Sequence, residues 1–101
     1  VNGSYGSAIS TVSTTTTLDG TYNVVLVDAT SGAVTINLPA VSAISGREYV
    51  IKKIDSSGNA VTIDGNASET IDGSTTSSLA TQNKYARIKC NGTAWYIIAN
   101  N

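Results

Sequence analysis

The segment Thr93–Ala99 constrains the fold most strongly, because the strand that it predicts is apolar on both faces. Successive side chains of a strand point to opposite faces, so Trp95 and Ile97 share one face. Tyr96 and Ile98 share the other face. A chain of 101 residues has little with which to cover both. Either loops cover the second face of a central strand or another copy of the chain does, and we favour another copy.

A second segment, Tyr22–Asp28, has the same two-faced pattern. Val25 and Val27 point to one face and alternate with three further apolar residues. An interface of about 800 Å² per partner is ordinary, and at roughly 25 cal/mol per Å² of apolar area it would add to a thin core. We therefore expect assembly to be coupled to folding. The two segments supply the candidate interface residues, which are Tyr22, Val24, Leu26, Trp95, Tyr96 and Ile98.

The composition of the chain argues against several functions. Charged residues make up 13% of the sequence and the net charge is −1, so a basic surface for nucleic acid is not expected. No apolar run approaches the roughly 20 residues that cross a bilayer, so membrane insertion is not expected either. Histidine is absent, which removes the commonest general base near neutral pH. We predict a protein that is not an enzyme and that has no cofactor.

The order of turns and short apolar segments predicts an all-β domain. Residues 1–20 are rich in Gly, Ser and Thr, and we interpret them as a leader or the end of a shaft. Such a segment forms strands where neighbouring chains supply partners and otherwise stays flexible. Residues 21–101 predict seven or eight short strands of an antiparallel β-sandwich, with a jelly roll as one form. The turn sequences at 30–32 and 55–59 predict hairpins within it, and Asn91-Gly92 predicts the turn before the last strand.

The order of these pieces resembles a small β domain that recurs in phage tail fibres and related virion appendage proteins. The resemblance covers roughly residues 21–99, and its pieces are the segments 22–30, 34–39, 46–53, 71–73 and 91–98. It implies a homotrimeric spike, fibre tip or decoration domain on the virion surface, in an extracellular setting. It also implies that the leader joins the domain to other virion proteins. Shaft repeats do not accompany the match, so the position in a particle stays open.

A domain of this kind is expected to attach to a host cell through many weak contacts made at once. Three identical faces presented together raise avidity well above that of one site. The expected partners are other copies of the chain, other virion proteins and a host-cell surface receptor, with glycans among the candidates. Two alternatives stay open. One is a purely structural decoration or trimerisation cap, and the other is a carbohydrate-binding module that acts as a monomer.

One predicted strand carries the candidate receptor-binding residues. Tyr85, Arg87 and Lys89 alternate along it and share its outer face, whereas Ile88 and Cys90 are expected on its inner face. An aromatic ring beside cations is the kind of surface that stacks on sugar rings. A solvent-exposed face without any ligand is the competing interpretation.

The remaining charged residues predict neither a catalytic nor a metal site. We interpret Lys52 and Lys53 as a solvated pair, although one of them needs a carboxylate such as Glu48 or Asp55 if it turns inward. We interpret Asp-Gly pairs in the loop after residue 63 as tight turns. The oxygen-bearing residues of that loop do not have the spacing of an EF-hand, and they are Asp64, Asn66, Glu69 and Asp72.

Overall fold

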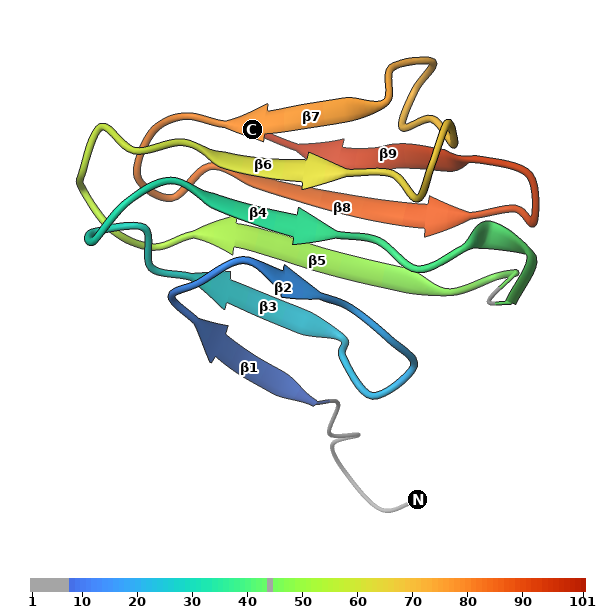
Figure 1. The fold of residues 1–101 in the computed structure, drawn as a ribbon, viewed down its shortest axis with the longest axis horizontal. Coiled ribbons are helices and arrows are strands. Elements are labelled where there is room, and N and C mark those ends of the chain that lie inside the picture. The colour runs from blue at the N-terminus through green and yellow to red at the C-terminus, as the bar shows by residue number, and fades with distance from the viewer. Residues whose placement is uncertain (1–7, 44) are drawn as a thin grey trace.

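The computed structural model describes residues 8–43 and 45–101, and Figure 1 shows two layers of β-strands. Apart from the short 3₁₀ helix η1 (Val41–Ala43), the regular elements of the described residues are strands, which confirms the all-β class. None of the described residues form a helix long and apolar enough to span a membrane. The strands are β1 (Ile9–Val12), β2 (Thr16–Thr17), β3 (Val24–Val27), β4 (Val34–Asn37), β5 (Glu48–Lys53), β6 (Val61–Asp64), β7 (Thr76–Leu79), β8 (Tyr85–Cys90) and β9 (Trp95–Asn100).

The strands form two mixed sheets. One has five strands in the order β1-β3-β5-β8-β9, and the other has four in the order β2-β4-β6-β7. From β1 to β6 the chain alternates between the sheets, so each strand that returns to a sheet lies parallel to its predecessor there. The strands β7, β8 and β9 then join antiparallel to their neighbours.

The predicted antiparallel arrangement, including the jelly-roll form, is therefore wrong for the strands β1 to β6, which pair in parallel with one another. The turns at 30–32 and 55–59 do not close hairpins; each leads the chain from the five-stranded sheet to the four-stranded sheet. A turn sequence determines a local change of direction, whereas the sheet that accepts the next strand is decided by long-range pairing. The same polar and glycine-rich sequence therefore suits a hairpin or a corner between two layers.

The described part of the predicted leader finds its strand partners within its own chain. β1 pairs with β3 and β2 pairs with β4, both in parallel register. Leu18, which follows β2, is buried in the common core. The hydroxyl of Tyr49 donates a hydrogen bond of 2.7 Å to the carbonyl oxygen of Asp19. The described residues from 21 onward form seven strands, β3 to β9, in agreement with the predicted seven or eight, and the leader adds β1 and β2. Residues 1–7 of the predicted leader lie outside the described residues.

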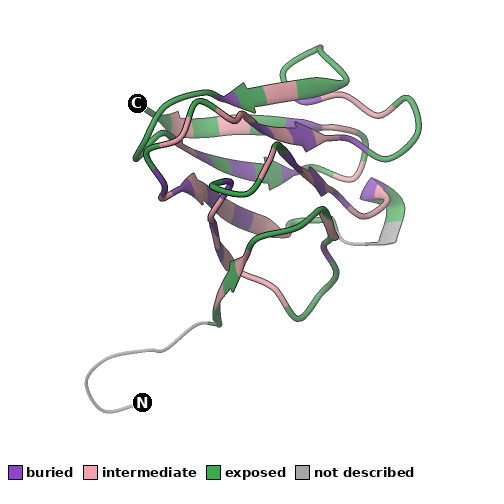
Figure 2. Ribbon diagram, turned by 60° about the vertical axis from the view of Figure 1, so that its left-hand side comes forward, coloured by how far each residue is buried: buried purple, intermediate pink, exposed green. Residues whose placement is uncertain are grey.

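Buried side chains from both layers form one core, and Figure 2 shows the alternation of buried and more exposed residues along the strands. Ile88 and Cys90 point inward from β8, as predicted, and Val25 and Val27, which share one face of β3, also point inward. The remaining large members come from both sheets and the connecting loops, and they include Leu18, Ile36, Leu38, Tyr49, Ile51, Ile63, Ile71 and Trp95.

The core is complete within one chain. The accessible surface is 5339 Å², close to the roughly 5,400 Å² that the size scaling gives for a compact monomer of this mass. Trp95 is fully buried and packs against Tyr49, with 5.6 Å between the ring centroids. Its side chain therefore offers no surface to a second copy, which removes Trp95 from the candidate interface residues. Tyr22 is partly buried against the same core, whereas Val24 and Leu26 point to the opposite face of β3.

Candidate functional site

The candidate site lies on the outer face of the five-stranded sheet, which points away from the core. The side chains that alternate with core residues on β5, β8 and β9 point to this face. Tyr96 and Ile98 have exposed fractions of 46% and 50%, which is high for large hydrophobic residues. The face is formed on these three strands by Glu48, Val50, Lys52, Tyr85, Arg87, Lys89, Tyr96 and Ile98.

The three predicted receptor-binding residues share this face but do not form one cluster. Arg87 donates from Nε to Oε2 of Glu48 on the neighbouring strand, at 2.7 Å. Tyr85 lies four residues from Lys89, a separation of about 13 Å along a strand. Of the three, Lys89 alone borders the pocket described next.

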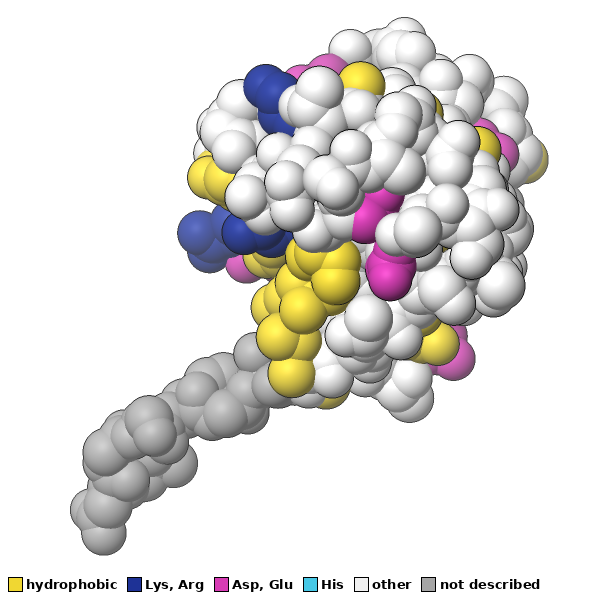
Figure 3. Space-filling view, turned by 90° about the vertical axis from the view of Figure 1, so that its left-hand side faces the viewer, with side chains coloured by type: hydrophobic (Ala, Val, Ile, Leu, Met, Phe, Trp, Pro, Cys, Tyr) yellow, Lys and Arg dark blue, Asp and Glu magenta, His cyan; other side chains and the backbone are white. Residues whose placement is uncertain are grey.

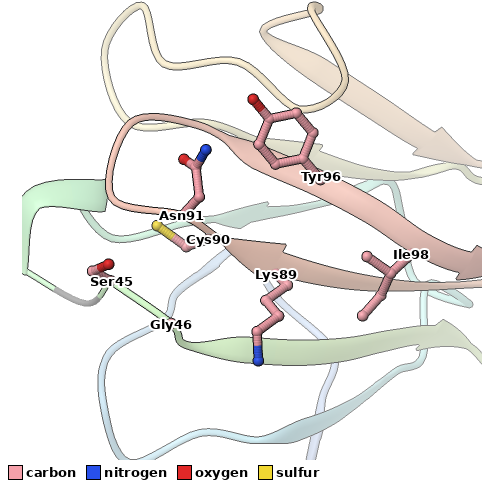
Figure 4. Close-up of a pocket in the computed structure, with 7 residues that line it drawn as sticks. All are labelled: Ser45, Gly46, Lys89, Cys90, Asn91, Tyr96 and Ile98. Carbon is pink, nitrogen blue, oxygen red and sulfur yellow. The ribbon is translucent and has the colours of Figure 1, made fainter.

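A pocket of about 380 Å³ opens on the outer face where β8 turns into β9. Figure 4 shows the side chain of Lys89 extending toward β5 and the ring of Tyr96 extending the opposite way, with Asn91 at the turn and Ile98 further along β9. Lys89 and Tyr96 are directly paired across the two strands. The pocket is lined by Ser45, Gly46, Lys89, Cys90, Asn91, Tyr96 and Ile98.

Backbone hydrogen bonds fix the floor of the pocket. The N–H of Gly46 donates to the carbonyl oxygen of Cys90 at 2.7 Å, and the N–H of Cys90 donates to the carbonyl oxygen of Arg47 at 3.0 Å. The thiol of Cys90 is buried on the inner side, where it behaves as a small apolar group. The start of β5 and the end of β8 are therefore held together beneath the pocket.

The turn between β8 and β9 forms one wall. Oδ1 of Asn91 accepts hydrogen bonds from the N–H groups of Thr93 at 2.9 Å and Ala94 at 3.0 Å, which leaves the Nδ2 group as the donor end of that side chain. Gly92 has a φ of +92°, a conformation that favours glycine. A Cβ atom there would also lie 3.1 Å from Oγ of Ser45. The Asn-Gly pair is thus a turn, as predicted, and it also positions a polar side chain.

The loop before β7 fixes the edge of β9, which carries the aromatic wall of the pocket. The N–H of Trp95 donates to the carbonyl oxygen of Thr70 at 2.8 Å, and the N–H of Asp72 donates to the carbonyl oxygen of Trp95 at 3.0 Å. Oδ1 of Asp72 accepts from the N–H of Ile97 at 3.1 Å. The Asp72-Gly73 pair forms a tight turn, as predicted, with positive φ at both residues. In residues 8–43 and 45–101, no three His, Cys, Asp or Glu side chains gather as metal ligands.

The outer face is electropositive although the chain is not. The outer face of β5 and β8 carries three cations and one carboxylate, which gives it a net charge of +2. The cations are Lys52, Arg87 and Lys89, and the carboxylate is that of Glu48. The whole chain has a net charge of −1. Glu48 pairs with Arg87, and among the described residues Lys89 has no carboxylate within ion-pair distance. The ammonium group beside the pocket is therefore available to an anion.

The interpretation of Lys52 and Lys53 as a solvated pair is wrong for Lys53. Lys52 points to the outer face, whereas Lys53 points inward and is fully buried. Nζ of Lys53 lies 2.7 Å from Oδ2 of Asp55, one of the two carboxylates that the sequence suggested as a partner. Adjacent residues of a strand must face opposite sides, so a buried partner was required.

Asp55 joins two corners of the fold. Its Oδ1 accepts from the N–H of Ala29 at 2.7 Å, and its Oδ2 accepts from the N–H of Ser57 at 3.0 Å and from the hydroxyl of the same residue. The hydrogen bond from Lys53, followed by that from the Ser57 hydroxyl, holds the pKa of Asp55 far below its usual range. Asn59 adds a hydrogen bond of 2.8 Å to the carbonyl oxygen of Ala29. We interpret this group as structural, because the ammonium is enclosed.

The sequence indicated part of this site. It identified Lys89 and the turn at Asn91-Gly92, but it favoured core or interface packing for Tyr96 over binding. Alternation puts Tyr96 on the face of β9 that lies opposite to the face of Trp95, and this signal was available from the sequence. The contribution of Ser45 had no sequence signal, because it depends on the pairing of β5 with β8.

Two comparisons with known proteins identify no relative. Neither the models of protein families nor the curated protein sequences give a match to this chain. The functional argument therefore depends on the geometry of the outer face.

Proposed function

We propose that this chain is a non-enzymatic, homotrimeric appendage domain that attaches to a host-cell surface receptor from the surface of a virion. The observation that carries the proposal is the outer face of the five-stranded sheet, where exposed apolar side chains and uncommitted cations lie on a rigid scaffold. The resemblance to virion appendage domains supports the choice of setting. The absence of histidine agrees with a binding function.

One half of the outer face suits contact between copies. Ile9, Val24 and Val50 form an apolar row across β1, β3 and β5, because their registers place them side by side. Leu26 lies next to this row on β3, and Ile9 has an exposed fraction of 65%. Figure 3 shows hydrophobic side chains gathered in a continuous patch beside Lys and Arg side chains. We call Ile9, Val24, Leu26 and Val50 the apolar row and assign it to the trimer contact.

The other half, on β8 and β9, suits contact with the receptor. It carries the three predicted residues Tyr85, Arg87 and Lys89, together with the pocket. We assign Tyr96 and Ile98 to this half, because both border the pocket and lie on β9, which β8 separates from the apolar row. A cyclic trimer would then present three receptor surfaces together, and the avidity of the assembly would exceed the affinity of one site.

A glycan array tests this proposal. The parent chain is compared with Ile9→Lys, which places a charge in the apolar row at an exposed position, and with Ser78→Lys, which adds the same charge on the outer face of the other sheet. The proposal expects array binding by the parent and by Ser78→Lys, and a loss of binding by Ile9→Lys at equal chain concentration. Equal binding by all three would instead indicate a carbohydrate-binding module that acts as a monomer.

A structural cap is the second candidate function. The self-contained pairing of β1 and β2 with their own chain favours it, because a compact end unit needs no receptor to explain its fold. A trimer that binds no glycan on the array and no host cells would support this candidate over attachment.

A further inference from the structure

We infer that the pocket between β8 and β9 binds the pyranose ring of a carboxylated sugar. This inference deepens the proposed function and depends on it in one respect, namely that the β8–β9 half of the outer face is free of contacts between copies. The pocket volume of about 380 Å³ lies at the small end of the range for ligand sites, which is roughly 300 to 1,000 Å³. A monosaccharide unit of a longer chain fits this size better than a large cofactor does.

The aromatic wall selects a sugar ring. The face of a phenol ring carries partial negative charge, and the C–H groups on one side of a pyranose carry partial positive charge, so the two stack. Tyr96 has an exposed fraction of 46%, and its backbone is fixed by pairing with β8. Ile98 continues the apolar surface two residues further along the same side of β9. A rigid ring beside an aliphatic side chain gives contact area with little loss of entropy.

The polar wall selects a carboxylate and hydroxyl groups. Lys89 lies directly across from Tyr96, and it has no carboxylate partner among the described residues. Asn91 presents its Nδ2 donor, because its Oδ1 is occupied by two backbone N–H groups. Ser45 adds a hydroxyl from the loop before β5. The donors outnumber the acceptors around an apolar platform, and the net charge of +2 on the adjacent surface favours an anionic ligand over a neutral one.

The experiment titrates the full ¹⁵N-labelled chain with tetragalacturonic acid and follows the amide signals by NMR. The matched probe is the same oligosaccharide with its carboxyl groups methyl-esterified. We expect signals of residues 89–91 and 96–98 to shift with the acid, and we expect the ester to bind about two- to five-fold more weakly because the ion pair with Lys89 is lost. Equal affinity for acid and ester would overturn the inference, as would the absence of shifts with the acid.

Variants then separate stacking from charge. Tyr96→Ala is expected to weaken binding by about ten-fold, whereas Tyr96→Phe retains the ring and binds as the parent does. Lys89→Gln is expected to weaken binding of the acid by about two- to five-fold, and Lys52→Gln, on the same face outside the pocket, is expected to weaken it less. Fluorescence of the buried Trp95 checks that each variant is folded. Equal losses for Lys89→Gln and Lys52→Gln would contradict a site in the pocket.

A nucleic-acid ligand is the competing chemistry, since bases also stack on aromatic rings beside cations. A single-stranded oligonucleotide of the same charge is therefore titrated in parallel, and tighter binding of it than of the tetrasaccharide would overturn the inference. The inference and the proposed function fail separately. A trimer that binds cells but not the acid contradicts only the inference, whereas a monomer that binds the acid contradicts only the proposed assembly.

Discussion

Substitution of Gly65 tests whether the loop before β7 is packed as described. A Cβ atom at Gly65 would lie 2.3 Å from the carbonyl oxygen and 3.1 Å from the carbonyl carbon of Glu69. Both are backbone atoms, so no side-chain rotation can relieve the contact. The N–H of Gly65 also donates to the carbonyl oxygen of Thr75 at 2.9 Å, which limits movement of the loop on its other side.

The magnitude follows from two opposing effects. Overpacking costs about 1 to 3 kcal/mol, whereas replacing glycine by alanine reduces the entropy of the unfolded chain and returns about 0.4 to 1 kcal/mol. We expect Gly65→Ala to lower the free energy of unfolding by up to about 2.6 kcal/mol relative to the parent. Relative to a Gly→Ala change without a clash, we expect a loss of about 1 to 3 kcal/mol, or roughly 4 to 24 °C in Tm for a domain of this size. Thermal unfolding followed by the fluorescence of Trp95, the single tryptophan, measures this change.

Gly58→Ala is the matched control. A Cβ atom at Gly58 has no atom within 4 Å, so only the entropic gain applies and Tm stays the same or rises. An unchanged Tm for Gly65→Ala relative to Gly58→Ala would refute the described packing of the loop. It would also weaken the site, because the same loop supplies Thr70 and Asp72 to the edge of β9.

Three further predictions concern buried polar groups. Lys53→Met is expected to lower the urea midpoint clearly, since it leaves Asp55 without its cation, whereas Lys52→Met stays within about 0.5 kcal/mol of the parent. The pKa of Asp55 is lowered on folding, so its contribution to stability is present above its unfolded pKa and is lost as the pH falls through the acid range. Urea unfolding from pH 7 downward should show this loss, and Asp55→Asn should show a shallower one; parallel curves would contradict it. Tyr49→Phe, which removes the hydrogen bond to Asp19, is expected to cost about 0.5 to 1.5 kcal/mol in the same assay, and no change would argue against that contact.

The sequence predicted the faces of the strands better than their pairing. Alternation placed Ile88 and Cys90 in the core and grouped Val25 with Val27 on one face, because a side chain's face depends on its own strand alone. The parallel pairing among β1 to β6 was missed, because it depends on which distant strand each new strand lies beside. The turn at 55–59 is a corner between sheets, and its composition is equally suited to a hairpin.

The candidate site was predictable to a similar degree. Lys89 was placed on the correct face by alternation, and the pairing of an inward lysine with Asp55 was among the options that strand geometry required. The pocket itself was not predictable, because its walls come from three segments that meet only after β5 pairs with β8 and β8 with β9. Ser45 and Asn91 illustrate this, since neither has a motif that indicates binding.

The oligomeric state tests the assignment of the apolar row most directly. Sedimentation equilibrium measures the solution mass of the parent chain, of Ile9→Lys and of Ser78→Lys. We predict three times the chain mass of 10.4 kDa for the parent and for Ser78→Lys, and a single chain mass for Ile9→Lys. A parent chain that sediments at a single chain mass would contradict the proposed assembly, and it would agree with the core that is already complete within one chain.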